Sequence, residues 1–189
     1  LPTVTDRIKE KHSWDYYYYG NASPRRPGWY TFDHRPRFNN NYIGLRNRMA
    51  ILSEAYAYDT FEDRVMATLW FVEEILEFAR EHAGRIRSIV ETADASVVGA
   101  ELATRATFEQ SDSEVTILMG EVQEERHPQT GEVILRRQDV SNPVSMYEYG
   151  TFAPTDVETV PAVYYVLPDA EDAIVRLRAH GLETSPAPT

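Results

Sequence analysis

Glu54 is the residue whose surroundings in the sequence point most directly to chemistry. It lies within the apolar stretch MAILSEAY, residues 49–56. A carboxylate in such a stretch is costly to bury unless it is paired, protonated or placed at the open end of its element. At an open end it can take a proton from a metal-bound water and return it to a leaving group. The alternative is a structural ion pair with a neighbouring arginine, and the candidates are Arg46, Arg48 and Arg64.

A run of arginines is the second feature with chemical potential. Six arginines between positions 25 and 48 are accompanied by a single acid, Asp33. Guanidinium groups bind carboxylates through two parallel hydrogen bonds, so the run is a candidate footprint for an anionic ligand. The alternative is that these side chains lie in a solvated loop or pair with acids elsewhere in the fold. The six are Arg25, Arg26, Arg35, Arg37, Arg46 and Arg48.

Charge and composition restrict the classes of function. The net charge of -11 argues against nonspecific binding to nucleic acid, although residues 1–48 hold nine Lys and Arg against four Asp and Glu. The absence of cysteine excludes disulfides and thiolate chemistry. The sequence contains no apolar run of about eighteen residues, which is the length that would predict a membrane span. The chain starts without Met or a signal-peptide pattern, so we expect a processed or partial chain, which leaves its compartment open.

A strand followed by a helix is expected to position Glu54. Residues 49–55 are continuously apolar, as in a strand of a parallel sheet that is covered on both faces. Glu54 would then lie near the C-terminal end of this strand, where open α/β sheets form their ligand crevice. Thr60, with Asp63 at the capping-box distance, predicts the start of a helix.

Apolar residues at intervals of three and four continue this helix to about His82. Gly84 predicts a break before a second helical piece that ends near Val98. On the N-terminal side, residues 1–13 are expected to form a polar helix. Residues 14–19 (WDYYYY) are expected to form a buried strand, with an aromatic binding face as the alternative. Residues 20–41 are expected to form a long loop, and a loop of this length within a compact domain is more often functional than not.

The pattern after Gly99 indicates short strands. They are expected over residues 104–109, 115–124 and 132–137, with a hairpin turn at 127–131 and a further apolar strand over 160–167. A short helix over residues 169–180 follows. Its N-cap is expected at Asp169, its inward residues are Val175 and Leu177, and its stop is Gly181.

The expected fold class is therefore α/β. A partial sheet with flanking helices occupies residues 1–98, and a small β-rich module with one short helix occupies residues 99–189.

The stretch GWYTFDHRPRFNNNYIGLRNRMAILSEAYAYDTFEDR, with the upstream WDYYYYGN and the long helix that follows, resembles a known family of enzymes. It is similar to the C-terminal part of the α/β/α catalytic domain in bacterial zinc carboxypeptidases of the carboxypeptidase A-like family. The resemblance covers residues 14 to about 83. Residues 160–183 also look like the end of the accessory module that such proteins carry.

The resemblance implies a hydrolase that cleaves a peptide or related amide bond next to a free carboxylate. Glu54 matches the family's general base and acid on zinc-bound water. Tyr30 and Tyr42 are both candidates for the family's mobile tyrosine. Arg46 and Arg48 do not match the family's Asn-Arg pair, because the order along the chain differs, but their guanidinium groups suit a substrate carboxylate. A secreted or periplasmic location is plausible by the same resemblance.

The zinc ligands of the family are missing from this chain. They form a His-x-x-Glu pair and a later histidine before the catalytic glutamate, where this sequence has only His12 and His34. A literal match, His180 to Glu183, follows Glu54 and straddles a helix stop, so we do not expect it to bind zinc.

We therefore expect the Zn2+ ligands in an upstream part of a longer enzyme, the missing N-terminal part of the catalytic domain, and an inactive chain on its own. A noncatalytic module that binds a carboxylate ligand is the first alternative. An unrelated α/β domain, with Glu54 held in a permanent ion pair, is the second.

Overall fold

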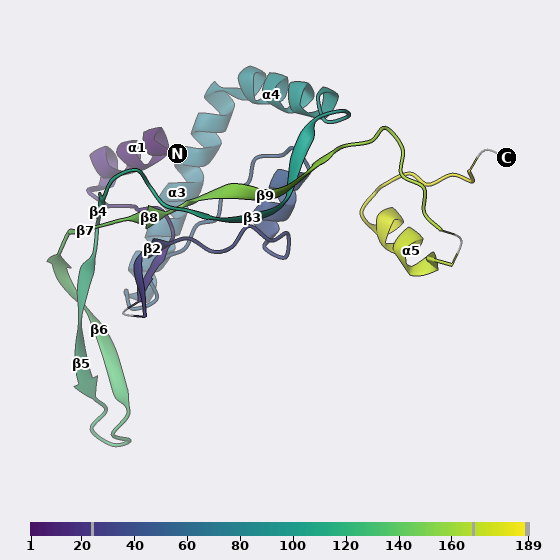
Figure 1. Ribbon diagram of the computed structural model, residues 1–189. Coiled ribbons are helices and arrows are strands. Elements are labelled where there is room, and N and C mark those ends of the chain that lie inside the picture. The colour runs from purple at the N-terminus through teal and green to yellow at the C-terminus, as the bar shows by residue number, and fades with distance from the viewer. Residues whose placement is uncertain (24, 168, 188–189) are drawn as a thin grey trace.

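A computed structural model describes residues 1–23, 25–167 and 169–187. It contains both helices and strands in small sheets, in agreement with a general α/β class (Figure 1). The helices are α1 (Pro2–His12), α2 (Asn39–Leu45), α3 (Phe61–Glu81), α4 (Ala83–Ala95) and α5 (Glu171–Ala179). The strands are β1 (Asn21–Ser23), β2 (Arg26–Tyr30), β3 (Glu101–Glu109), β4 (Val115–Ile117), β5 (Gly120–Arg126), β6 (Val133–Ser141), β7 (Val144–Met146), β8 (Glu148–Tyr149) and β9 (Thr151–Thr159).

The main hydrophobic cluster lies between α1 and α3. Val4 and Ile8 of α1 and Phe71 of α3 are buried together. The expected helices at residues 1–13 and after Thr60 are therefore confirmed, and the packing of Phe71 against Val4 and Ile8 stabilises both. The expected break near Gly84 is confirmed at His82, where α3 ends and α4 begins. Partly buried side chains surround the cluster: Trp14, Tyr16, Trp70, Ile75 and Phe78.

The strands of the described residues form four small sheets. The longest pairing is the antiparallel ribbon of β3 and β9, which crosses the middle of the molecule in Figure 1. The β5–β6 hairpin projects away from it, and its turn confirms the expected turn at residues 127–131. β4 pairs with β7, and β1, β2 and β8 form a three-stranded sheet. The only parallel pairing among the described strands joins β2 and β8.

Gly28 allows β2 and β8 to approach closely. Its φ is +106°, and a Cβ atom at this position would lie 2.8 Å from the Tyr149 ring and 3.0 Å from the Tyr147 carbonyl oxygen. A side chain would therefore collide with the neighbouring strand as well as strain the backbone.

Three expected strands are wrong. Residues 14–19, 49–55 and 160–167 have no regular secondary structure. Side chains of the first segment pack on α3 instead of on a sheet: Trp14 contacts Trp70 edge to face, and Tyr16 stacks on Phe71. The other two segments find no strand partner among the described residues, and a strand covered on both faces requires neighbours that complete its sheet.

Two further expectations need correction. The loop expected over residues 20–41 contains β1, β2 and the start of α2. The N-cap of α5 is Ala170, not Asp169, and Val175 is 64% exposed instead of pointing inward. Gly181 has a φ of +74° and ends the helix as expected. Within the described ranges, no helix has both the length and the apolarity needed to cross a membrane.

Candidate functional site

Glu54 lies in the irregular segment between α2 and α3, and its side chain is exposed. We refer to residues 49–58 as the Glu54 segment. Within the described part of the chain, the Glu54 carboxylate makes no hydrogen bond or ion pair. The expected exposure is therefore present, but it comes from an irregular segment and not from the end of a strand.

Two of the three arginines proposed as structural partners of Glu54 are engaged elsewhere. Arg46 donates to the carbonyl oxygen of His180 at 2.9 Å. Arg48 donates to Asp94 Oδ1 of α4 at 3.0 Å, and this bond lowers the pKa of Asp94. Arg64, in the first turn of α3, has a buried Nε without a hydrogen-bond partner among the described residues. The Glu54 carboxylate is thus left free to contact a ligand.

Arg35 and Arg37 lie beside the one acid of the arginine run. Arg35 Nε donates to Asp33 Oδ2 at 2.9 Å, and Arg37 Nη2 lies 3.4 Å from the same oxygen. The hydrogen bonds from Arg35 lower the pKa of Asp33 to about 2. These contacts correspond to the alternative in which the arginines are paired within the fold.

The two candidate tyrosines have separate environments. The ring of Tyr30 stacks on Tyr149 at 4.0 Å, and the guanidinium of Arg26 lies 3.4 Å from its centroid on β2. The Tyr42 hydroxyl hydrogen-bonds His180 Nδ1 at 2.8 Å. Neither tyrosine makes a hydrogen bond with Glu54 among the described residues.

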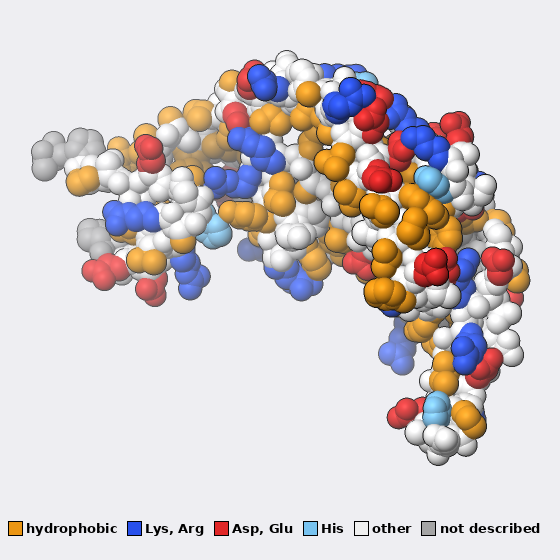
Figure 2. All heavy atoms as spheres, turned by 180° about the vertical axis from the view of Figure 1, so that it is seen from behind, with side chains coloured by type: hydrophobic (Ala, Val, Ile, Leu, Met, Phe, Trp, Pro, Cys, Tyr) orange, Lys and Arg blue, Asp and Glu red, His pale blue; other side chains and the backbone are white. Residues whose placement is uncertain are grey.

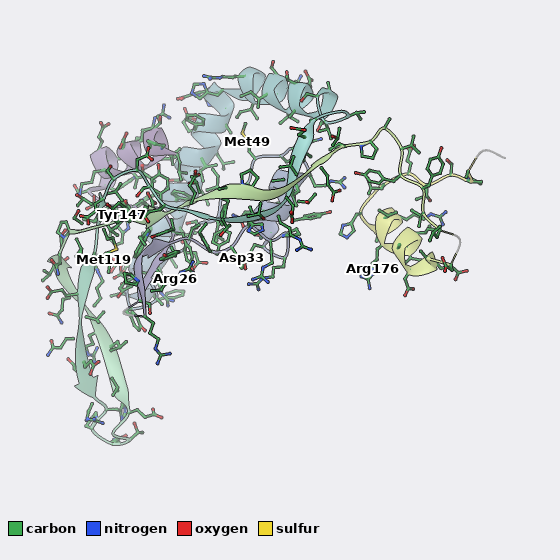
Figure 3. The ribbon with its side chains drawn as sticks, in the orientation of Figure 1. Arg26, Asp33, Met49, Met119, Tyr147 and Arg176 are labelled. Carbon is green, nitrogen blue, oxygen red and sulfur yellow. The ribbon has the colours of Figure 1, made fainter. Side chains whose placement is uncertain are left out.

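The labelled side chains of Figure 3 show on which side of the β3–β9 ribbon some of these features lie. Arg26 and Asp33 lie below the β3–β9 ribbon in this view, whereas Met49, the first residue of the Glu54 segment, lies above it. Arg26, and Asp33 with the arginines that contact it, are therefore separated from Met49 in this view, whereas Arg48 directly precedes Met49 in the chain.

A cleft of about 290 Å³ lies at the C-terminal end of the Glu54 segment. It is formed by the start of α3 and by β6, and Asp59 and Arg137 meet across it with an Oδ1–Nη1 distance of 2.9 Å. Sequence reasoning missed this pair, because residues 78 positions apart carry no local signal of their contact. The cleft is lined by Tyr58, Asp59, Thr60, Asp63, Ile134, Leu135, Arg136 and Arg137.

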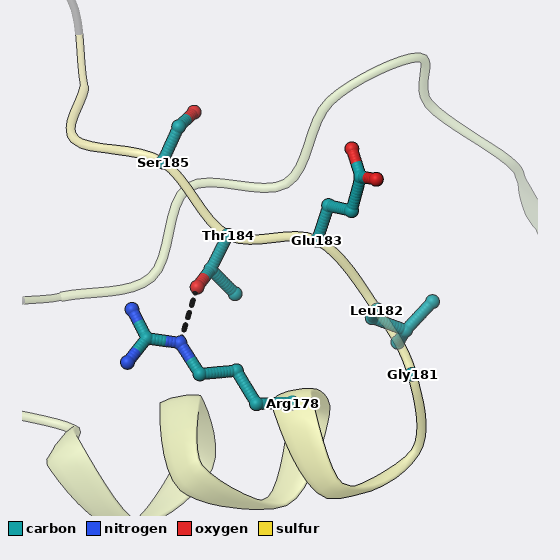
Figure 4. A pocket seen from close by; sticks show the side chains of 6 residues that line it. All are labelled: Arg178, Gly181, Leu182, Glu183, Thr184 and Ser185. Atoms are coloured by element: carbon teal, nitrogen blue, oxygen red, sulfur yellow. Dashed lines mark hydrogen bonds between the residues drawn. The ribbon is translucent and has the colours of Figure 1, made fainter.

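A second, open cavity of about 690 Å³ follows α5 and is lined in part by Glu183, the last residue of the literal His-x-x-Glu match (Figure 4). Arg178 Nε donates to Thr184 Oγ1 at 2.7 Å, and the Glu183 side chain points away from Arg178. His180 Nδ1 is hydrogen-bonded to the Tyr42 hydroxyl. No group of three His, Asp or Glu side chains in the described ranges is arranged to hold a metal ion.

Comparison with known proteins identified no matching family model, no similar curated protein and no similar solved structure. The resemblance to zinc carboxypeptidases therefore depends on the sequence motifs around Glu54.

Proposed function

We propose that this chain is the C-terminal part of a zinc-dependent carboxypeptidase, to which it contributes Glu54 as the residue that accepts and returns a proton during hydrolysis. The observation that carries the proposal is the stretch around Glu54, which resembles the segment that bears the general base in that family. The exposed carboxylate is compatible with this role, because a group that transfers protons must reach its substrate.

The metal site has to be supplied from outside the described residues. These residues do not fit zinc, since no three potential ligands lie together. The chain by itself is accordingly expected to be inactive, and no step that involves the metal is assigned to its residues.

The exposed apolar surface of the Glu54 segment supports the proposal that this chain belongs to a larger enzyme. Met49, Ile51 and Leu52 of the Glu54 segment are each more than two-fifths exposed. An apolar segment without a strand partner is the kind of element that a larger sheet would cover. We propose that the N-terminal part of the catalytic domain covers it.

Arg48 is the better placed of the two arginines for binding a substrate carboxylate. Its pair with Asp94 is about half exposed on both sides, so the pair contributes little to stability. A substrate carboxylate can replace Asp94 at small cost. Arg46 would first have to leave the carbonyl oxygen of His180.

A noncatalytic binding module is the second candidate. It is favoured by the lack of a metal-binding group in the described residues and by the arginine run. The two candidates differ in what the complete reading frame encodes upstream: His-x-x-Glu and a later histidine support the enzyme, and their absence supports the module.

The test uses the product of the complete reading frame, assayed on a peptide with a free C-terminus and on its C-terminally amidated form. We expect cleavage of the free form only, loss of activity with a zinc chelator, and recovery on adding Zn2+.

Glu54→Gln is expected to lower kcat by about 100- to 10,000-fold with unchanged zinc content. Glu73→Gln, which alters another exposed acid, is the matched control. Full activity of the Glu54 variant would show that the assignment is wrong.

A further inference from the structure

The Asp59–Arg137 pair connects the end of the Glu54 segment to the β-rich module. Asp59 closes a turn by donating its backbone N–H to the Tyr56 carbonyl oxygen at 3.1 Å. Its Oδ1 accepts from Arg137 Nη1 at 2.9 Å and from the Thr60 N–H at 3.0 Å. Arg137 belongs to β6, where it lies opposite Val122 of β5. The contact therefore joins the N-terminus of α3 to the projecting hairpin.

Burial makes this ion pair unlike the others near the site. The Asp59 side chain is 7% exposed and that of Arg137 is 37% exposed. A carboxylate removed from water in this way needs its partner, because an unpaired buried charge is strongly unfavourable. Arg137 also lies 3.5 Å from Asp139, but that carboxylate is fully exposed and contributes little.

The Glu54 segment has few other attachments. Residues 49–58 donate no hydrogen bond to another element within the described chain. At one end the segment follows Arg48, whose pair with Asp94 is half exposed, and at the other it precedes Asp59. The better buried contact is thus the one with the β-rich module.

We propose that Arg137 is a positioning residue: through Asp59 it fixes the Glu54 segment, so that the β-rich module determines where the Glu54 carboxylate lies. The attachment itself is independent of the proposed function. Its consequence for catalysis rests on that function.

The attachment is tested on the whole chain by hydrogen exchange and limited proteolysis. Arg137→Gln should raise the exchange rates of the Asp59 and Thr60 amides, and the rate of chymotryptic cleavage after Tyr56 and Tyr58, by about tenfold. Arg136→Gln is the matched control, because Arg136 lies next in the same strand and pairs with Glu125 inside the hairpin. Equal effects of the two variants, or none, would overturn the attachment.

A double variant separates the pair from general damage to the hairpin. If the two side chains act through each other, Asp59→Asn combined with Arg137→Gln should raise cleavage no further than Arg137→Gln alone. Additive increases would show that Arg137 acts through another contact.

The catalytic consequence is tested on the product of the complete reading frame. Arg137→Gln should lower kcat more than it changes KM, and Arg137→Lys should recover part of the loss. Faster proteolysis without a change in kcat would overturn the link to Glu54 while the attachment stands. Loss of activity in Glu54→Gln together with unaltered proteolysis of Arg137→Gln would leave the proposed function supported and refute the positioning role.

Discussion

Tyr16 shows at the scale of one residue how α3 determines the state of a titrating group. Its ring stacks on Phe71 at 5.0 Å, and its hydroxyl donates to the carbonyl oxygen of Ala67. Burial raises the pKa of Tyr16 from 10.0 to about 12. The folded state therefore keeps this phenol protonated at a pH where the unfolded chain ionises it.

This shift predicts a dependence of stability on alkaline pH. The contribution of Tyr16 is complete below pH 10, the unfolded value, and is lost as the pH rises through about 12. Tyr16→Phe should lower the free energy of unfolding by about 1 kcal/mol near neutrality, because the bond to Ala67 is lost. It should also reduce the decline between these two pH values. Urea unfolding at a series of pH values measures both effects.

Tyr165→Phe is the control, because Tyr165 is 76% exposed. It should leave the stability and its alkaline decline unchanged. If Tyr16→Phe follows the same alkaline decline as the unmodified chain, the burial of the Tyr16 hydroxyl is not what opposes its ionisation.

Two glutamates show what can and cannot be read at the level of single residues. Glu54 lies in an apolar stretch of the sequence, where burial of its carboxylate has to be considered, yet its side chain is exposed. Of the two, the buried glutamate is Glu74, at 5% exposure, whose Oε1 accepts from Lys11 of α1. Its neighbours in the sequence do not reveal this, because its burial depends on α1 packing across that face of α3.

At the scale of elements, α3 starts where its local sequence specifies. Thr60 Oγ1 accepts from the Asp63 N–H at 3.1 Å and donates to the Asp63 carboxylate at 2.7 Å. This cap satisfies a backbone donor that the helix itself leaves unpaired.

Thr60→Ala is therefore expected to lower the free energy of unfolding by about 1 kcal/mol. Thr68→Ala is the matched control, since Thr68 lies inside the helix and donates only to the Arg64 carbonyl oxygen. Because alanine is the better helix former, the control should not lower stability. Urea unfolding compares the two, and an equal loss in both would contradict a specific role for the cap.

The contrast between helices and strands explains how much of the fold the sequence could predict. Caps and three-to-four spacing are local, so α1, α3 and the break at His82 were predictable. The pairing of Glu101 with Thr159 in the β3–β9 ribbon is not local. Residues 49–55 have the composition of a buried strand, but composition cannot provide the neighbours that a strand requires.

The sequence could likewise predict only part of the candidate site. A free carboxylate at Glu54 could be expected from its sequence context. The occupation of Arg48 by Asp94 and the Asp59–Arg137 pair depend on contacts between distant segments. One sequence contains no signal for either contact.

At the scale of the whole molecule, the amount of exposed surface is unusual. The accessible area is 14647 Å², whereas a compact monomer of 21.7 kDa exposes about 9,200 Å². Figure 2 shows apolar side chains gathered over the region of α3 on the rear face. Five apolar residues follow one another at intervals of three and four along this helix, all of them exposed: Phe61, Val65, Leu69, Val72 and Leu76. A contiguous stripe of this kind favours association.

We therefore expect the isolated chain to self-associate through the α3 stripe. Replacing Leu69 and Leu76 by Lys should shift sedimentation at micromolar concentrations toward the monomer, because two charges would have to be buried in any contact. Val98, in the turn after α4, and Val133, in β6, are also exposed but lie in separate segments, and provide the matched control when replaced by Lys. The control should remain associated, since isolated apolar side chains do not form a continuous surface. A compact monomer of the unmodified chain would contradict the expectation, and would mean that α3 covers its apolar face by rearranging within the chain.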